Sequence, residues 1–171
     1  TLDCSYNNLI TLPPEIGYLS NLRELNLDEN ELITLPREIG LLTKLKYLMV
    51  SCNAITYLPP EIGSGSLTNL KRLSLHDNKL TILPLSLDFG SFTKLREIDL
   101  SKNNFNILPP KIWSLITLHR LVIYENNLTK LSSEIGLFTD LQELYIGYNK
   151  LTTLPPELFS LTNLQLLELN N

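Results

Sequence analysis

The stretch LRELNLDENELITLPREIGLLTK, from Leu22 to Lys44, contains a pattern that the rest of the 171-residue chain repeats. The pattern reads LxxLxLxxNxLxxLPxxIxxLxx. Its successive units lie 23, 25, 25, 23, 23 and 23 residues apart and open at Leu22, Leu45, Leu70, Leu95, Leu118, Leu141 and Leu164. One unit before Leu22, the residues from Leu2 to Leu19 follow the same pattern. Such self-similarity is typical of a protein built by stacking one structural unit on the next.

The spacing within one unit predicts its local structure. The LxLxx segment alternates apolar and polar residues at the period of a strand that buries one face. A unit this short cannot bury its own leucines, so neighbouring units have to stack, with parallel strands joined by right-handed crossovers. Proline after a template leucine favours a short helical turn on the opposite side, at Pro13, Pro36, Pro59, Pro84, Pro109 and Pro155. Ser132 is the one departure.

We therefore expect an α/β repeat solenoid, a horseshoe with a concave parallel sheet and short helical or 3-10 turns on its convex side. It would be a single unit over residues 1–171, with about six full repeats and a partial repeat at each end. The partial repeats, the lack of polar capping repeats and the single methionine, Met49, predict that the chain is part of a longer protein. Leucines exposed at open ends predict end-to-end association.

The repeat resembles that of the leucine-rich repeat family over essentially the whole chain. The 23-residue LPxxIxxL variety is similar, more narrowly, to the intracellular class found in Ras-suppressor and Ras-scaffold proteins, the Scribble and Erbin group, plant Ras-group proteins and Roco GTPases. Similar repeats also occur in bacterial proteins. The resemblance implies a curved solenoid that binds other proteins, with small GTPases or other signalling proteins as candidate partners.

An asparagine recurs after every strand segment. The members of this asparagine column are Asn7, Asn30, Asn53, Asn78, Asn103, Asn126 and Asn149. A buried amide has to be hydrogen-bonded, and a column of amides can satisfy backbone groups where each unit turns away from the sheet. We interpret the column as structural.

Position within the template sorts the strand residues into core and concave surface. The x of LxL forms a central column: Asp3, Asn26, Met49, Ser74, Asp99, Val122, Tyr145 and Glu168. Columns beside it carry Tyr6, Tyr47, Tyr124 and Tyr148. Because parallel strands lie about 4.8 Å apart, Val122, Tyr124, Tyr145 and Tyr148 should form one displayed patch. Exposed tyrosines are typical of interface hot spots, although tyrosine also favours strands for its own sake.

We expect Tyr124, Tyr145 and Tyr148 to be the leading anchors for a protein partner, with Tyr47 and Met49 second. A basic edge occupies one template position in successive repeats and consists of Arg23, Lys46, Lys71 and Arg96, followed by His119. This row could steer an acidic partner. The alternative is a solvated edge that pairs with carboxylates such as Glu24 and Glu97.

Candidates for chemistry are few. Cys52, His76 and Asp77 should fall on the concave side of adjacent repeats, which suggests a thiol and imidazole pair or a partial metal site. A regular sheet offers no deep pocket and only three ligands converge, so we expect neither catalysis nor a metal or other cofactor. The sequence contains no phosphate-binding loop, GxGxxG or HExxH motif.

Composition excludes several classes of function. With a net charge of -4 and no block of Lys or Arg, the chain is a poor candidate for nucleic acid binding. Its apolar runs are far shorter than the roughly 20 residues that cross a bilayer. Two cysteines without a CxxC pair indicate neither a disulfide framework nor a zinc site, and favour a cytoplasmic location. The alternative is a secreted or surface-exposed bacterial protein.

Two adjacent repeats carry insertions of two residues each, around residues 64–66 and 89–91. We expect them to form a local bulge on the convex or flanking side, tolerated without purpose. Phe89 leaves open a second binding surface there. Trp113 and Phe159 should pack on the convex flank, and Cys4, at a template leucine position, should be a buried small hydrophobe.

The pattern favours a protein-protein interaction module or scaffold that binds on its concave sheet, without catalysis of its own. The first alternative is a regulatory or substrate-recruiting segment of a multidomain enzyme, such as a Roco GTPase, a kinase, a cyclase or a ubiquitin ligase. A weaker alternative is a bacterial effector or adhesin.

Overall fold

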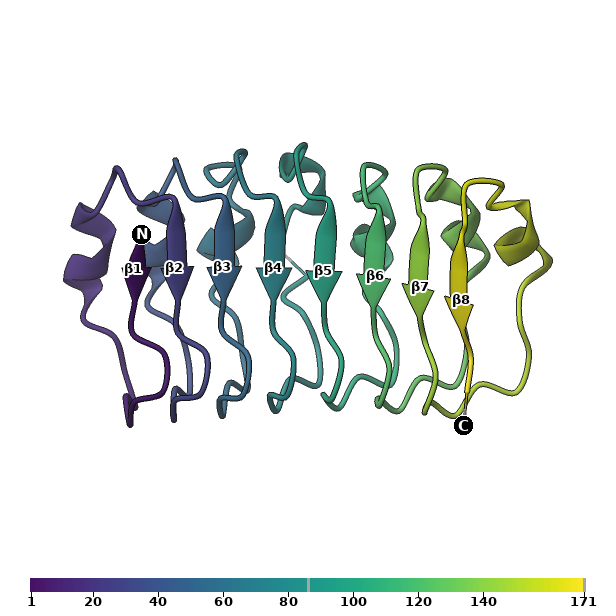
Figure 1. Cartoon of the computed structure of the whole chain (residues 1–171), viewed down its shortest axis with the longest axis horizontal. Helices are drawn as coiled ribbons and strands as arrows, with labels where there is room; N and C mark the ends of the chain where they lie inside the picture. The colour runs from purple at the N-terminus through teal and green to yellow at the C-terminus, as the bar shows by residue number, and fades with distance from the viewer. Residues whose placement is uncertain (86, 171) are drawn as a thin grey trace.

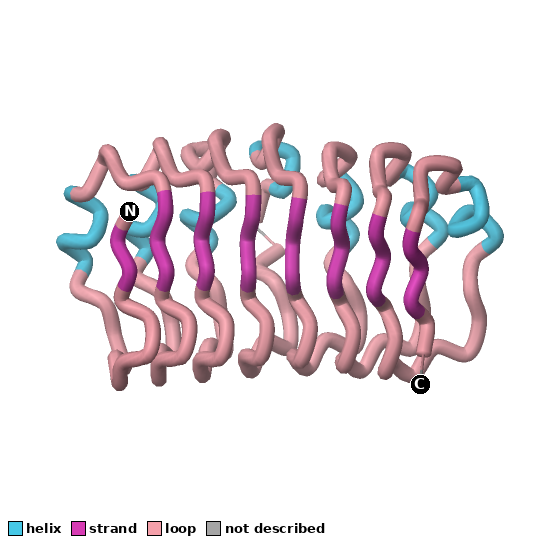
Figure 2. Tube along the Cα trace, viewed as in Figure 1, coloured by secondary structure: helices cyan, strands magenta, loops and turns pink. Residues whose placement is uncertain are grey.

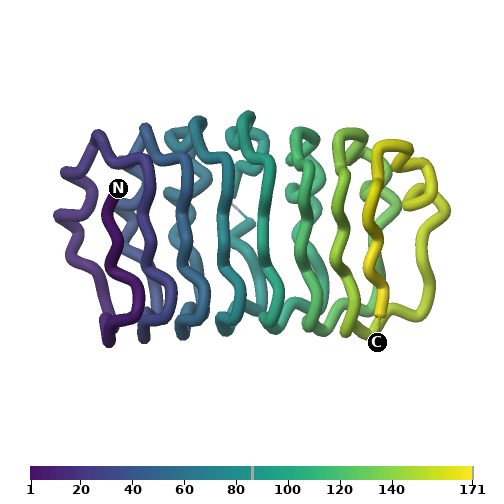
Figure 3. Tube along the Cα trace, in the orientation of Figure 1, coloured from purple at the N-terminus to yellow at the C-terminus, as the bar shows by residue number. Residues whose placement is uncertain are grey.

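A computed structural model describes residues 1–85 and 87–170. Within them, eight strands form one parallel sheet whose spatial order is the order of the chain. The strands are β1 (Leu2–Asp3), β2 (Glu24–Asn26), β3 (Tyr47–Met49), β4 (Arg72–Ser74), β5 (Glu97–Asp99), β6 (Arg120–Val122), β7 (Glu143–Tyr145) and β8 (Leu166–Glu168). They lie side by side along the long axis (Figure 1), and the chain advances steadily from one end to the other (Figure 3). The expected α/β solenoid is confirmed.

Short 3-10 helices lie on the opposite side of the coil from the sheet, as Figure 2 shows. Those found in the described residues are η1 (Pro14–Tyr18), η2 (Arg37–Leu41), η3 (Pro60–Gly63), η4 (Phe89–Ser91), η5 (Pro110–Ser114), η6 (Ser133–Leu137) and η7 (Pro156–Ser160). A proline in extended conformation precedes η1, since the ring holds φ at -69°. Ser132 adopts the same conformation before η6, with φ -73° and ψ 151°, so this departure from the template leaves the turn unchanged.

The core runs without interruption through the coil. Leu25, Leu48 and Leu144 at the strand centres are fully buried, as are Ile39 and Ile62 of the helical turns. They belong to one cluster of buried apolar side chains. Fully burying one such side chain stabilises the fold by about 1.5–3 kcal/mol, and each repeat contributes several.

Each repeat from β1 to β7 leaves the sheet through a residue in the left-handed conformation. Among the described residues other than glycine, φ lies between 49° and 56° at Tyr6, Glu29, Cys52, Asp77, Lys102, Glu125 and Tyr148. This conformation lets two successive N–H groups donate to the next repeat: Glu29 N–H to Ser51 O, and Asn30 N–H to Cys52 O. The turn therefore connects neighbouring repeats, although the left-handed region costs a residue with a Cβ about 1–2 kcal/mol.

The asparagine column completes this turn, as Asn103 illustrates. Its side-chain amide donates to Leu75 O of the preceding repeat at 2.9 Å, and to Leu100 O and Ser101 O of its own. Its side-chain oxygen accepts the N–H of Leu80 at 3.0 Å. Asn30, Asn78, Asn126 and Asn149 make the equivalent contacts and are buried, whereas Asn7, in the first repeat, is exposed.

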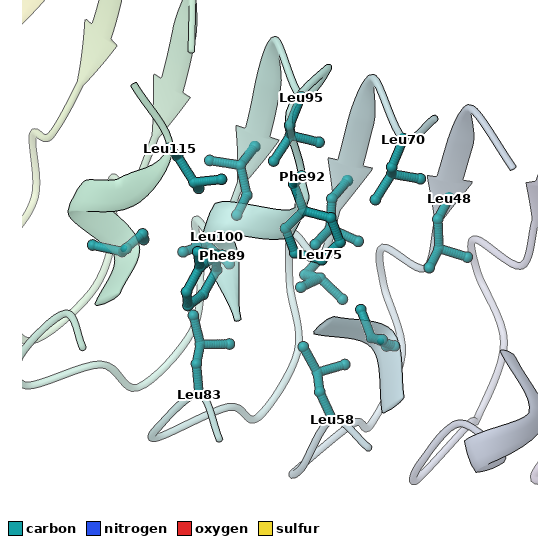
Figure 4. Packing of buried hydrophobic residues seen from close by; sticks show 14 of the residues in the cluster. Leu48, Leu58, Leu70, Leu75, Leu83, Phe89, Phe92, Leu95, Leu100 and Leu115 are labelled. Carbon is teal, nitrogen blue, oxygen red and sulfur yellow. The ribbon is translucent and has the colours of Figure 1, made fainter. Parts of the chain in front are cut away.

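The first insertion forms the expected exposed loop, and the second departs from the expectation. At the first, Ser64 and Gly65 are exposed, and Gly65 has φ +89° with open space around it. At the second, Phe89 is 2% exposed and its ring lies 6.2 Å from that of Phe92. Figure 4 shows both rings among the core leucines. The prediction that Phe89 offers a second binding surface is wrong, because the extra residues let an aromatic ring turn inward.

The insertions also touch one another. Asp88 N–H donates to Gly63 O, and a Cβ at Gly63 would lie 2.7 Å from Leu87 Cγ, so glycine allows this close approach. The sheet register is preserved, since Leu48 pairs with Leu73 and Leu73 with Ile98. Ser86, which precedes the second insertion, and Asn171, the last residue, lie outside the described residues.

Trp113 and Phe159, the two residues predicted to pack on the convex flank, differ in burial. Trp113 is buried with its ring centroid 5.5 Å from that of Phe138, as a packing residue should be. Phe159 is 72% exposed, so its expected packing is wrong. Cys4 is only partly buried, against the core of the first repeat.

None of the helices in the described residues has the length and apolar character that a membrane span requires.

Replacing Asn103 with alanine should lower the free energy of unfolding by about 3 kcal/mol, because buried backbone groups of three chain segments lose their partner. The matched control is Asn104→Ala, at an exposed neighbouring position, which should change stability by less than about 0.5 kcal/mol. Urea denaturation followed by circular dichroism measures both. Equal losses in the two variants would contradict the structural role of the column.

Glycine should be tolerated at the exposed left-handed position of Glu125. We expect Glu125→Gly to be neutral or to stabilise by up to about 1 kcal/mol, because it relieves the left-handed backbone. Lys150→Gly, at an exposed residue outside that conformation, should destabilise by about 0.5–1 kcal/mol. The same denaturation experiment compares the two variants, and a larger loss for Glu125→Gly would show that the turn is not limited by this strain.

Candidate functional site

The concave face carries a hollow of about 520 Å³, which we call the tyrosine hollow. Tyr124, Tyr145 and Tyr148 line it together, although they come from two repeats. Tyr145 is half-buried, Tyr148 is 56% exposed, and Tyr148 occupies the left-handed turn position. Val122 lines the same hollow but is only 4% exposed, so the prediction that it is displayed is wrong. Longer side chains around the short Val122 side chain cover it, so that it lies at the bottom of the hollow.

A ladder of alternating charges crosses the sheet beside the tyrosines. Arg72, Glu97, Arg120 and Glu143 occupy equivalent positions of β4, β5, β6 and β7, and the register pairs each with the next. Glu97 lies 3.5 Å from Arg72 and 3.7 Å from Arg120, and Arg120 lies 3.2 Å from Glu143. Opposite charges on adjacent strands stabilise each other and hold the long side chains in place.

Arg120 connects the charge ladder to the tyrosine hollow. Its guanidinium carbon lies 4.9 Å from the centre of the Tyr145 ring, a favourable cation–π geometry. Within the described chain, Arg120 Nε is buried and has no hydrogen-bond partner. The Tyr145 hydroxyl donates to Glu143 at 3.1 Å, and burial together with this hydrogen bond raises the pKa of Tyr145 above its ordinary value. The hydroxyl therefore stays a donor at neutral pH.

Tyr47 and Met49, the second-ranked anchors, do not share the tyrosine hollow. They line a separate hollow of about 490 Å³ together with Lys71 and Arg96 of the basic edge. Both are half-buried. The concave face thus offers two neighbouring depressions, and Arg72 lines both.

The basic edge lies where the chain enters the strands. The backbone carbonyls of Arg23, Lys71 and Arg96 accept N–H groups of the following repeats. Among the described residues, no ion pair includes Arg23, Lys46, Lys71 or Arg96, and Glu97 pairs with Arg72 and Arg120 instead. The expected pairing of this edge with Glu24 and Glu97 is therefore wrong. Its role in steering a partner stays a prediction.

A second polar cluster lies around His76. His76 Nδ1 is 2.8 Å from Ser101 Oγ, and the Ser101 hydroxyl donates to Asp99. Ser101 is fully buried, so this serine is not available as a nucleophile. The ring of His76 lies 6.1 Å from that of Tyr124, at the rim of the tyrosine hollow.

The three chemical candidates from the sequence meet at this cluster. The ligand atoms of Cys52, His76 and Asp77 all lie within 4.8 Å of one another. Burial is the main cause that raises the pKa of the Cys52 thiol to about 11, and the nearby carboxylates of Glu29 and Asp77 raise it further. The thiol is therefore protonated at neutral pH and is a weak nucleophile, which argues against a thiol and imidazole catalytic pair.

Sequence reasoning missed two of these features. The charge ladder has a signal in the sequence, since one template position alternates in sign from Arg72 to Glu143. The link from His76 through Ser101 to Asp99 had no clear signal, because it joins two columns of neighbouring repeats through side-chain conformation.

The model for a leucine-rich repeat region matches residues 2–101, and the leucine rich repeat model matches residues 94–115 and 140–161. The chain belongs to the leucine-rich repeat family. A search of curated protein sequences gives no match to this leucine-rich repeat chain. The finer resemblance to the intracellular class stays a prediction.

Solved structures share the fold. A leucine-rich repeat protein of Leptospira interrogans is 40% identical with a TM-score of 0.93, over 98% of this chain and 42% of that one. The plant peptide hormone receptor RGFR1, in complex with RGF2, is 30% identical with a TM-score of 0.77, over 93% of this chain and 26% of that one. An internalin of Listeria monocytogenes is 21% identical with a TM-score of 0.72, over 94% of this chain and 52% of the internalin chain. The chain thus spans half or less of the length of the first two.

Cys52 should react slowly with alkylating agents. The experiment uses a Cys4→Ser variant, so that Cys52 is the one cysteine, in buffer with a metal chelator. At pH 8, Cys52 of the folded variant should react about 100-fold more slowly than in the same variant denatured by urea, because a pKa of about 11 leaves little thiolate. The rate should keep rising up to about pH 11, and Asp77→Asn should increase it. Mass spectrometry of the alkylated protein measures the rate, and a plateau near pH 9 would contradict the raised pKa.

Proposed function

We propose that this leucine-rich repeat chain is a protein-interaction module that binds a segment of a protein partner in the tyrosine hollow and has no catalytic role of its own. The observation that carries the proposal is the convergence of Tyr124, Tyr145 and Tyr148 with Arg72 and Arg120 in one hollow of the concave sheet. Tyrosine and arginine are the residue types most enriched among interface hot spots.

The rigidity of the surface supports the proposal. Tyr145 is fixed by its hydrogen bond to Glu143 and by Arg120, which stacks on its ring. Side chains held in place before binding lose little entropy when a partner arrives. The guanidinium groups of Arg72 and Arg120, which line the hollow, favour a partner segment that presents a carboxylate or carbonyl group beside its aromatic or apolar residues.

The relatives support protein binding in general terms. The family commonly mediates protein interactions, and the receptor RGFR1 is described in complex with RGF2. A signalling or scaffold role, a small GTPase as partner, and a cytoplasmic location are finer parts of the proposal. The alternatives of a regulatory segment in a larger enzyme and of a bacterial effector or adhesin, and end-to-end association, stay predictions as well.

The test compares two triple variants in affinity capture from the native source. Tyr124, Tyr145 and Tyr148 are changed to alanine in one variant, and the exposed tyrosines Tyr6, Tyr18 and Tyr57, outside the hollow, are changed in the other. We expect the first variant to lose the captured protein and to bind the purified partner at least about 100-fold more weakly, since hot-spot residues each contribute about 2 kcal/mol or more. The second variant should bind within about threefold of the wild type, which corresponds to roughly 0.6 kcal/mol.

Circular dichroism of both variants verifies the fold before binding is measured. Retention of the partner by the first variant, or equal loss by both, would contradict binding in the tyrosine hollow. The hollow that Tyr47 and Met49 line, beside the basic edge, would then be the next surface to change.

A further inference from the structure

Cys52, His76 and Asp77 form a compact set of metal-ligating side chains. Their sulfur, nitrogen and oxygen ligand atoms lie within 4.8 Å of one another. In a tetrahedral Zn²⁺ site, bonds of about 2.0–2.3 Å place neighbouring ligand atoms about 3.5 Å apart. Rotation of the Cys52 and Asp77 side chains can close this difference. Thiolate, imidazole and carboxylate together suit Zn²⁺, whereas Mg²⁺ and Ca²⁺ favour oxygen ligands alone.

The backbone already holds the three residues together. Cys52 N–H donates to His76 O at 2.8 Å, and Asn53 N–H donates to Asp77 O at 3.1 Å. Cys52 and Asp77 both occupy the left-handed turn position, with φ 53° and 51°. The backbone that carries the three side chains is therefore already fixed, and little of it has to become ordered when a metal binds.

The hydrogen bonds of His76 point to a ligand on its other nitrogen. The hydroxyl proton of Ser101 goes to Asp99, so Ser101 Oγ accepts from His76 Nδ1. This arrangement protonates Nδ1 and leaves the lone pair on Nε2 free. A metal-binding histidine almost always donates its second N–H to a carboxylate or another acceptor in this way, which fixes the ring and increases its basicity.

Against the expectation from the sequence that these residues hold no metal, we propose that Cys52, His76 and Asp77 form a three-ligand Zn²⁺ site on the concave face, with Ser101 and Asp99 as positioning residues. The bonds are Zn²⁺ to Cys52 Sγ, His76 Nε2 and one Asp77 carboxylate oxygen, and the Cys52 proton is released to solvent. Asp28 and Glu29 act electrostatically on the thiol and make the surroundings favourable for a cation. The fourth position is open to water or to a side chain of a bound protein.

The site shares His76 and Asp99 with the lining of the tyrosine hollow. The His76 ring lies 6.1 Å from the Tyr124 ring, so a metal would alter the polarity of one part of the binding surface. Neither the ligand set nor its geometry includes a tyrosine. Zinc binding and partner binding can therefore succeed or fail separately.

Isothermal titration of the chelator-stripped protein with ZnCl₂ tests the proposal. We expect one Zn²⁺ per chain and a loss of affinity of about 100-fold or more in Cys52→Ser and His76→Asn, since even outer hydrogen-bond partners contribute 10–100-fold. The matched controls Cys4→Ser and His119→Asn change the other cysteine and the other histidine and should leave the affinity unchanged. Circular dichroism verifies that every variant is folded.

Co²⁺ provides a readout that a purely structural change would not move. The wild type should show a thiolate-to-cobalt charge-transfer band that Cys52→Ser removes. Asp99→Asn should weaken Zn²⁺ binding by about 10–100-fold and shift the cobalt d–d bands, because the orientation of the His76 ring changes. Unchanged affinity and spectra in Asp99→Asn would refute the positioning role. A wild type that binds no Zn²⁺, or binds it equally well without Cys52 and His76, would overturn the site.

Discussion

The hydrogen bonds of the asparagine column hold each repeat of the solenoid to the one before it. Each repeat has to turn out of the sheet, and the turn leaves backbone groups that water cannot reach. In the described repeats, one amide such as that of Asn103 satisfies carbonyls of its own turn and of the preceding repeat, and accepts an N–H as well. The residue before each of these asparagines is in the left-handed conformation, which costs free energy. Contacts with the neighbouring repeats of the stack offset this cost.

Because the turns from Asn30 to Asn149 are fixed in the same way, the strands keep one register even where the chain gains residues. Leu48, Leu73 and Ile98 pair in sequence across both insertions. The additional length is absorbed outside the sheet, as an exposed loop at Gly65 and as an inward ring at Phe89. Side chains at one template position therefore form straight columns on the concave face, and the identity of each column member determines its chemistry.

This column geometry explains how a plain sheet acquires two kinds of chemistry. Along one column, alternating charges from Arg72 to Glu143 hold Arg120 against the Tyr145 ring. Among three other columns, Ser101 links His76 to Asp99, and His76 lies beside Cys52 and Asp77. Residues one repeat apart in the sequence lie one strand apart on the sheet of a solenoid. Side chains of neighbouring repeats can therefore form a site together without any change of the fold.

The repeated pattern predicts the coil, the sheet, the convex turns and the asparagine column, because a pattern repeated in every unit leaves the backbone one consistent solution. It also placed Tyr124, Tyr145 and Tyr148 on the same face. The packing of the folded chain, in contrast, was needed to show that Val122 is covered, that Phe89 points inward and that Phe159 is exposed. These outcomes depend on side-chain lengths and rotamers in neighbouring repeats, and a one-dimensional template assigns a direction to each residue without describing what covers it.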